Sequence, residues 1–450
     1  MVLVYHGYTG RLAALLSSTG IEPGDRVRVV KDGEVFEGVL MPRYTVRASE
    51  DILVIKLENG YNIGVKVDER TQVFLASKKA RPEKVVQPEG TVESKAKIVL
   101  LSTGGTIASK IDYETGAVVP ALSTREITEW APDLADIAVF EAREVMRVFS
   151  EDITPSDWER LANEVYREME QGVNGVVIAH GTDMMSYSAA ALAFAIRDKP
   201  VPVVFVGSQR SSDRPSSDSI LNLKGAFITA SRAPIAESVV AMHASTSDDL
   251  IAVHRGVKVR KMHTSRRDAF QSINDKPILL VNPYTLEIKQ VGRILKSRDP
   301  TRTPVLEARF DDKVALVKAY PGVQNEIIDM LVDKGFHGIV IEGSGLGHIS
   351  NRLLDSIKRA VESGIPVVMT SQCLFGRVNL NVYSTGRRLL EAGVIPAEDM
   401  LPEVAYVKLS WVLASKTRDL AEVRKWMLTN LEGEINYRHT LDLYPRWSYE

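Results

Sequence analysis

The chain has 450 residues, of which 44% are apolar and 25% are charged, and its formal net charge at pH 7 is -2. A chain of this length exceeds what one hydrophobic core holds and suits about three domains. The balanced charge excludes a global basic field that would hold a polyanion, so any contact with nucleic acid must be local or made by a partner.

Cysteine, histidine and N-terminal patterns favour a cytoplasmic protein without a metal site. The single cysteine, Cys373, cannot form an internal disulfide, which fits a reducing compartment. The eight histidines form no HExxH pattern and there is no CxxC pair, so no metal is expected. The apolar stretch at residues 12–16 is too short for a secretion signal or a membrane span, and no membrane association is expected.

The first part of the chain, residues 1–80, is predicted to form a small SH3-like antiparallel β-barrel. Short β-branched runs alternate there with Asp32-Gly33 and Asn59-Gly60, dipeptides that supply the positive φ angles of two-residue hairpins. Residues 81–96 are rich in Lys, Pro and Glu and have no apolar period, so they are predicted to be a linker.

The remaining chain alternates strand and helix patterns, which predicts an α/β fold with two lobes built on mostly parallel sheets. The first lobe is expected over residues 97–289, with a helix that has Thr154 as N-cap and Pro155 in its first turn. Residues 290–312 are charged and contain prolines, and they are predicted to connect this lobe to a second one over residues 313–450.

Two threonines are predicted to carry the chemistry. Thr106, in TGGT, and Thr182, in HGTD, follow glycines where apolar runs end, which places hydroxyls at the carboxyl edge of an α/β sheet. A threonine hydroxyl needs a base or a tuned environment to act as a nucleophile, and glycine N–H groups can stabilise an oxyanion. The TGGT turn alone also fits a phosphate-binding turn or a plain loop. Asp183 is a candidate to anchor a substrate ammonium and a candidate cap for the helix that begins near Ser186, and the two roles are compatible.

Lys261 lies in a strongly basic stretch, which by itself predicts a solvated cationic face or a patch for an anionic partner. A lysine acts as a base only when burial or positive neighbours lower its pKa, whereas a nearby Asp183 would raise it. The protonation state of Lys261 is therefore left open. The other basic residues of the stretch are Arg255, Lys258, Arg260, Arg266 and Arg267. His180 is expected to be a packed, hydrogen-bonded histidine rather than a general base.

In order and spacing, TGGTIA, HGTDMM, VGSQR and the K-x-x-T that begins at Lys261 resemble the bacterial-type L-asparaginase and glutaminase family. The resemblance covers about residues 97–433, since GSGLG and SQCLFGRV are similar to the family's C-terminal lobe. It implies that Thr106 is the nucleophile, that Thr182 is the second catalytic threonine, that Asp183 also grips the substrate's α-ammonium, and that Lys261 orients and polarises Thr182.

The same resemblance implies that Ser150 and Glu151 bind the α-carboxylate and α-ammonium of the substrate, with Glu151 where the periplasmic-type enzymes usually have glutamine. Tyr113 is a loosely aligned candidate for a lid tyrosine. Periplasmic-type tetramers complete each site with an acidic residue from a neighbour's C-terminal lobe, yet no acidic residue lies between Cys373 and Gly386. This difference argues for another assembly, or for a site completed by another protein.

The barrel fused ahead of these lobes resembles the D-subunit family of archaeal glutamyl-tRNA(Gln) amidotransferases. The resemblance implies an amidohydrolase that uses glutamine or asparagine to supply ammonia for converting Glu-tRNA(Gln) to Gln-tRNA(Gln). It implies a homodimer and a partner, the amidotransferase E subunit, which contacts tRNA(Gln) and holds ATP and Mg, with no cofactor in this chain. The alternatives are a free-standing cytoplasmic L-asparaginase and a non-catalytic nucleic-acid-binding protein, against which the balanced charge counts.

Overall fold

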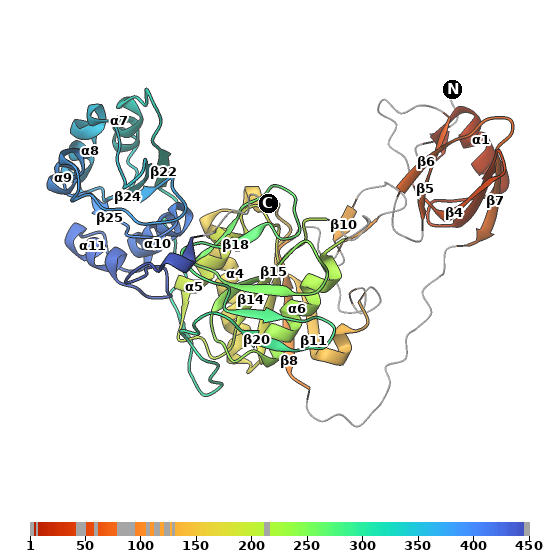
Figure 1. The fold of residues 1–450 in the computed structure, drawn as a ribbon, viewed down its shortest axis with the longest axis horizontal. Coiled ribbons are helices and arrows are strands. Elements are labelled where there is room, and N and C mark those ends of the chain that lie inside the picture. Colours follow the sequence, from red (N-terminus) through yellow and green to blue (C-terminus); the bar gives the residue numbers. More distant parts are fainter. Residues whose placement is uncertain are drawn as a thin grey trace. The chain divides into compact units, whose positions relative to one another are not determined.

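The computed structural model describes the chain in several stretches, which are residues 4–5, 8–41, 51–57, 62–78, 95–104, 109–111, 118–120, 127, 131–210 and 217–444. Thr106, Tyr113 and the Asn59-Gly60 turn lie outside these residues. The chain divides into two compact units. The first comprises residues 1–94 with two short segments, 106–121 and 208–220, and the second comprises the rest (Figure 1).

The first unit is built on a five-stranded antiparallel sheet with the strand order β6-β5-β4-β3-β7. Its strands are β3 (Arg26–Lys31), β4 (Glu34–Leu40), β5 (Ile52–Leu57), β6 (Asn62–Lys66) and β7 (Gln72–Ser77). Asp32 and Gly33 join β3 to β4 with φ angles of 49° and 85°, as the predicted two-residue hairpin requires. The antiparallel N-terminal sheet expected from the sequence is thereby confirmed.

A helix that the sequence did not predict packs on this sheet. Helix α1 (Gly10–Thr19) buries Leu12 and Leu16 in the same apolar cluster as Val27 and Leu53. The unit also contains two short strand pairs, β1 (Val4–Tyr5) with β2 (Tyr8–Thr9) and β9 (Ser109–Ile111) with β10 (Val118–Pro120). The cluster therefore gives this unit a hydrophobic core of its own.

The second unit contains an eight-stranded sheet with the order β11-β8-β12-β14-β15-β16-β19-β20. Its strands are β8 (Lys97–Ser102), β11 (Val139–Glu144), β12 (Gly175–Ala179), β14 (Val203–Val206), β15 (Ser238–His243), β16 (Ile251–Arg255), β19 (Leu279–Val281) and β20 (Ile288–Gln290). The strands from β11 to β15 run parallel, and those from β15 to β20 pair antiparallel. The antiparallel half forms because no helix separates these last strands along the chain.

The helices of this region are α3 (Leu134–Ile137), α4 (Pro155–Glu170), α5 (Met185–Ala195) and α6 (Ser219–Arg232). Helix α4 begins as predicted, with Thr154 and Asp157 forming a reciprocal capping box and Pro155 in the first turn. Its apolar side buries Trp158, whose indole N–H donates to Ser188 Oγ of α5 at 3.0 Å. Helix α5 is buried at every position except Tyr187, which fits its mainly apolar sequence.

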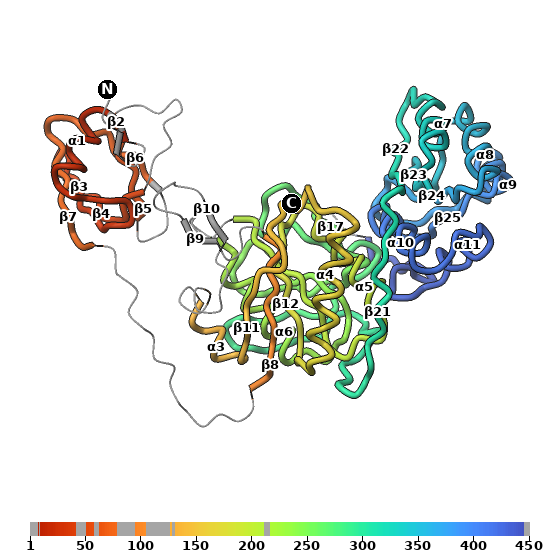
Figure 2. The backbone as a smooth tube through the Cα atoms, turned by 180° about the vertical axis from the view of Figure 1, so that it is seen from behind, coloured from red at the N-terminus to blue at the C-terminus, as the bar shows by residue number. Residues whose placement is uncertain are grey.

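The C-terminal part of the second unit is a four-stranded parallel sheet, β22-β23-β24-β25 (Figure 2). Its strands are β22 (Val314–Lys318), β23 (Gly338–Gly343), β24 (Val367–Ser371) and β25 (Ile395–Pro396), and its helices are α7 (Glu326–Asp333), α8 (Leu354–Glu362), α9 (Ser384–Glu391), α10 (Pro402–Ser415) and α11 (Leu420–Leu428). The shorter elements are η1 (Ser150–Asp152), η2 (Asn351–Leu353), η3 (Leu441–Leu443), β13 (Ile196–Arg197) with β21 (Val305–Leu306), and β17 (Val259–Lys261) with β18 (Phe270–Ser272).

One continuous core joins the two sheets of the second unit. Helix α10 packs against α5, and Phe194 of α5 stacks on Trp411 of α10 with ring centroids 5.8 Å apart. The α/β architecture with parallel sheets in two lobes is therefore confirmed, and the lobes share buried surface around α5 and α10.

Candidate active site

The loops after β8 and β12 leave the large sheet at the same edge. The two strands are parallel neighbours, and the backbone N–H of Thr103 donates to the carbonyl of Ala179 at 3.0 Å. Gly104 then turns the chain with a φ of 106°, and a Cβ added to it would lie 2.8 Å from the carbonyl oxygen of Val148. Only glycine fits this turn, which begins the TGGT loop that contains Thr106.

The loop after β12 and the short strand β17 bring three of the predicted residues together. The Lys261 side-chain nitrogen donates to the Thr182 hydroxyl at 2.9 Å and to an Asp183 carboxylate oxygen at 2.7 Å. The Lys261 side chain is 13% exposed, whereas that of Asp183 is 63% exposed. Lys261 is thus held from one side by two oxygens, and Asp183 keeps free surface on which a substrate can bind.

Ser150 and Glu151 lie in η1, directly beside this loop. A Cβ added to Gly181 would lie 2.8 Å from Ser150 Cβ and 2.9 Å from Ser150 Oγ. Ser150 is buried, and its hydroxyl lies 3.4 Å from the Glu151 carboxylate. The structure therefore brings five predicted site residues into one region, formed by the η1 segment, the loop after β12 and β17.

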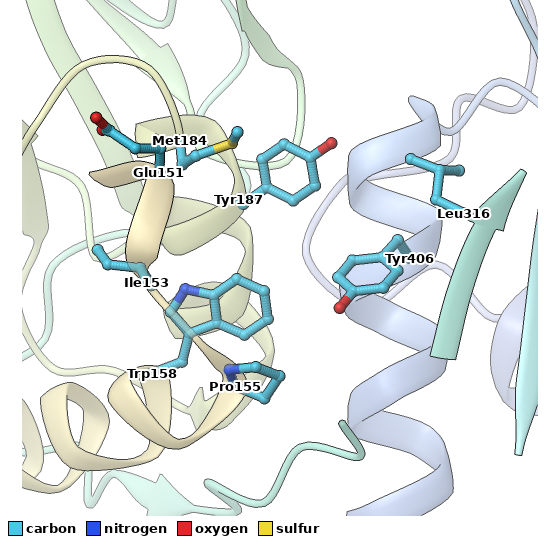
Figure 3. Close-up of a pocket in the computed structure, with 8 residues that line it drawn as sticks. All are labelled: Glu151, Ile153, Pro155, Trp158, Met184, Tyr187, Leu316 and Tyr406. Atoms are coloured by element: carbon cyan, nitrogen blue, oxygen red, sulfur yellow. The ribbon is translucent and has the colours of Figure 1, made fainter. Parts of the chain in front are cut away.

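A hollow of about 250 Å³ adjoins these residues, between elements of the two lobes (Figure 3). It is lined by Glu151, Ile153, Pro155, Trp158, Met184, Tyr187, Leu316 and Tyr406. Figure 3 shows the carboxylate of Glu151 turned away from the aromatic rings of the hollow. The rings form a mainly apolar chamber behind η1, and the Glu151 carboxylate points out of it.

The aromatic lining was missed by sequence reasoning. Tyr187 lies in the first turn of α5, directly after the loop with Thr182 and Asp183, and its closeness in sequence to them could have drawn attention to it. Burial raises the pKa of Tyr187 to about 12, so the phenol stays neutral. Tyr406 comes from α10, with its ring centroid 6.2 Å from that of Tyr187, and no local pattern connects it to the site.

The back of Thr182 is packed against the end of the neighbouring strand. A Cβ added to Gly207, which follows β14, would lie 2.7 Å from Thr182 Cγ2 and 2.7 Å from Met185 Cε. The carbonyl of Gly207 accepts a hydrogen bond of 3.0 Å from the Asn222 side chain, which fixes this segment. Thr182 consequently has little room to move away from Lys261.

His180 is buried, and its Nδ1 lies 2.7 Å from the carbonyl oxygen of Gly181. Burial lowers its pKa to about 4, so the ring is neutral at pH 7. A packed and hydrogen-bonded histidine was the expectation at this position. The neutral ring supports the backbone just before Thr182.

Two sequence-based interpretations are wrong. Asp183 does not cap α5, because Met184 is the N-cap residue and no side chain caps the helix there. The basic stretch is not a solvated face at Arg255 and Lys258, because both side chains are buried. Arg255 pairs with Glu237 and Asp275, and the Lys258 nitrogen lies 2.6 Å from an Asp399 oxygen. Carboxylates distant in sequence compensate these charges in the interior, which local charge patterning cannot reveal.

Among the residues that the structure describes, no three His, Cys, Asp or Glu side chains come close enough together to hold a metal ion. In the same part of the chain, no helix has the length and apolar character needed to cross a membrane.

Family models match three parts of this chain. Residues 97–291 match the family described as Asparaginase, N-terminal, and residues 313–427 match the Glutaminase/Asparaginase C-terminal domain. Residues 21–75 match the GatD N-terminal domain.

The chain is also similar over its whole length to proteins named as the D subunit of glutamyl-tRNA(Gln) amidotransferase. The protein of Sulfurisphaera tokodaii is 49% identical over 445 residues, which cover 99% of this chain and 98% of the relative. The protein of Thermofilum pendens is 50% identical over 454 residues, which cover 98% and 99%.

Among solved structures, the thermostable L-asparaginase of Thermococcus kodakarensis superposes with a TM-score of 0.69 at 36% identity, over 76% of this chain and all of that one. L-asparaginase I of Vibrio cholerae superposes with a TM-score of 0.66 at 28% identity, over the same shares. The asparaginase-like part therefore makes up about three quarters of this chain.

Proposed function

Because this chain belongs to the D-subunit family of glutamyl-tRNA(Gln) amidotransferases, we propose that it hydrolyses the side-chain amide of glutamine or asparagine to supply ammonia for a tRNA-dependent amidotransferase. The observation that carries the amidohydrolase role is the contact of Lys261 with the Thr182 hydroxyl and the Asp183 carboxylate. Lys261 contacts the Thr182 hydroxyl, and the Asp183 carboxylate beside it is exposed enough to bind an amino acid. This arrangement suits proton transfer at a bound substrate.

In the proposed reaction, the Thr106 hydroxyl attacks the carboxamide carbon and backbone N–H groups stabilise the oxyanion. The hydroxyl proton passes through Thr182 and Lys261 to the departing amide nitrogen, which leaves as ammonia. Water then attacks the acyl-threonine ester, releases glutamate or aspartate and restores the hydroxyl. Ser150, Glu151 and Asp183 hold the α-carboxylate and α-ammonium of the substrate, so that the free energy of binding is used to orient the side-chain amide. No cofactor takes part in this scheme.

The ammonia is consumed at a second protein, which we propose is the amidotransferase E subunit. That partner binds tRNA(Gln) with ATP and Mg and converts Glu-tRNA(Gln) to Gln-tRNA(Gln) in the cytoplasm. We further propose that this chain is a homodimer within the complex. We propose that residues 97–289 form the lobe that carries the active site and that residues 313–450 form the second lobe of the asparaginase-like pair.

A free-standing L-asparaginase is not favoured. The L-asparaginases superpose on about three quarters of this chain, whereas the D-subunit relatives match it from end to end, including the N-terminal unit.

The proposal is tested by measuring ammonia release from glutamine and asparagine by the full chain, alone and with the E subunit and Glu-tRNA(Gln). Stimulation by the partner and charged tRNA is expected, and Thr106→Val should abolish release while the protein stays folded. Full activity without the partner would favour the free-standing enzyme, and normal turnover by Thr106→Val would remove the nucleophile from the mechanism.

A further inference from the structure

Strand β17, which supplies Lys261, is fixed by the C-terminal lobe. Arg260 donates to Glu403 at 3.2 Å, and Lys258, directly before the strand, lies 2.6 Å from Asp399. Both carboxylates are buried and lie close together in the chain, in the segment that enters α10. Two ion pairs thus connect the last residues before Lys261 to one short part of the other lobe.

The pleat of the strand separates these anchors from the active site. Side chains alternate between the two faces of a strand, so Lys258 and Arg260 point to one side while Val259 and Lys261 point to the other. Val259 is fully buried in the shared core, and Lys261 reaches Thr182 and Asp183. The position of the Lys261 backbone is therefore set from the face opposite to the one that meets the site.

The two carboxylates on the C-terminal lobe are held by interactions of their own. Glu403 lies in the first turn of α10, where the helix dipole favours a carboxylate. Asp399 accepts hydrogen bonds from the backbone N–H and the side-chain amide of Asn436, at 2.8 and 2.9 Å, and from His439 at 3.1 Å. A carboxylate held in this way fixes the basic side chain opposite it, and through that side chain the strand.

The geometry points to Glu403, with Asp399 beside it, as a positioning residue for the amide hydrolysis proposed above: acting through Arg260 and Lys258, these carboxylates keep Lys261 on the Thr182 hydroxyl. The inference rests on the proposed function for its effect on turnover, but the placement of Lys261 can be measured separately. Neither carboxylate belongs to the motifs from which the site was predicted. The two carboxylates thereby act on the proposed chemistry through β17.

The experiment compares Glu403→Gln with the wild-type full chain by two readouts. The first is trace acetylation of lysines with acetic anhydride, followed by mass spectrometry of the peptides, with Lys425 as the reference because its side chain is 73% exposed. Acetylation of Lys261 relative to Lys425 should rise severalfold once the strand is released. The second readout is glutamine hydrolysis, measured with the E subunit added, for which kcat should fall about 10-fold, since small misplacements of reacting groups carry large kinetic costs. KM should change less, because two of the three proposed substrate-binding residues, Ser150 and Glu151, belong to η1 and not to β17.

A matched control is Glu168→Gln. Glu168 of α4 is buried and pairs with Arg143 of β11, whose side chain is 36% exposed, close to the 34% of Arg260, and neither residue lies on or next to β17. The control should lose stability without changing Lys261 acetylation or the kcat of the folded protein. If Glu403→Gln does not fold, Arg260→Met removes the same ion pair at its more exposed partner, which is 34% exposed. Glu403→Asp keeps a carboxylate, so it should retain part of the wild-type kcat and of the wild-type protection of Lys261.

Unchanged Lys261 acetylation together with normal kcat in folded Glu403→Gln or Arg260→Met, alongside an inactive Lys261→Met, would overturn the positioning role. Equal effects of Glu403→Gln and Glu168→Gln on both readouts would also overturn it, since general destabilisation would then suffice. If instead Lys261→Met hydrolyses glutamine normally, the proposed role of Lys261 in the reaction fails, and if the wild-type chain with the E subunit releases no ammonia from glutamine or asparagine, the proposed function fails. Faster acetylation of Lys261 in Glu403→Gln would still support the placement of Lys261 by Glu403.

Discussion

Substituting Gly207 by alanine should impair catalysis by displacing Thr182. The added Cβ would lie 2.7 Å from Thr182 Cγ2, whereas carbon atoms in contact prefer about 3.5–4.0 Å. The threonine must therefore shift by about 1 Å, and the 2.9 Å hydrogen bond to Lys261 cannot keep its geometry. A misplacement of this size costs about 100-fold in kcat, which corresponds to about 2.7 kcal/mol.

The assay is ammonia release from glutamine at saturating substrate, with the thermal midpoint measured in parallel. Overpacking alone costs about 1–3 kcal/mol of folding stability, so a control of the same kind is needed. Gly338→Ala serves, because its Cβ would lie 2.8 Å from Leu409 Cδ2 and 2.8 Å from Leu413 Cδ1, at the start of β23 in the C-terminal lobe. Both variants should lose stability, and only Gly207→Ala should lose kcat in the folded protein. Wild-type kcat in Gly207→Ala, or equal losses in the two variants, would refute the reasoning.

Three further predictions concern the site and its supporting structure. Lys261→Met should lower kcat by about 100-fold or more with little change in the thermal midpoint, since it removes a proton-transfer partner from a half-exposed cluster; kinetics with a melting curve checks this. Burial lowers the pKa values of His180 and His254 to about 4. Between about pH 6.5 and pH 4 these histidines are protonated in the unfolded chain but not in the folded chain. The free energy of unfolding should therefore fall as the pH drops from 6.5 towards 4. At pH 5 the loss is about 2 kcal/mol per histidine, and urea unfolding at pH 7 and pH 5 should show a smaller difference for His254→Gln than for the wild type. Thr154→Ala should destabilise the protein by about 1 kcal/mol by removing the capping box of α4, whereas Ser363→Ala, after the end of α8, should change stability little.

Local patterns predicted much of this molecule because the responsible interactions are local. The Asp32-Gly33 hairpin, the Thr154 cap of α4 and the α/β alternation depend on residues that are close in sequence. The proximity of Thr182 and Lys261, 79 residues apart, was accessible only through a family resemblance.

What the sequence could not reveal depends on partners that are distant along the chain. Lys258 is buried because Asp399, 141 residues later, compensates its charge, and composition alone made it look like a surface residue. The aromatic hollow needs Tyr406 of α10 to meet Tyr187 of α5. Helix α1 was missed because its single amphipathic stretch is short and stands beside strand-like segments.

The stack of Phe194 on Trp411 has a consequence for how this protein can be divided. The hydrophobic core around α5 and α10 is common to both lobes, so each lobe needs the other to bury its apolar side chains. A fragment that ends near residue 312 would expose the apolar side of α5 to water. Calorimetry of the asparaginase-like body should therefore record a single melting event, and truncation or gene fission between the lobes would yield insoluble pieces rather than independent modules.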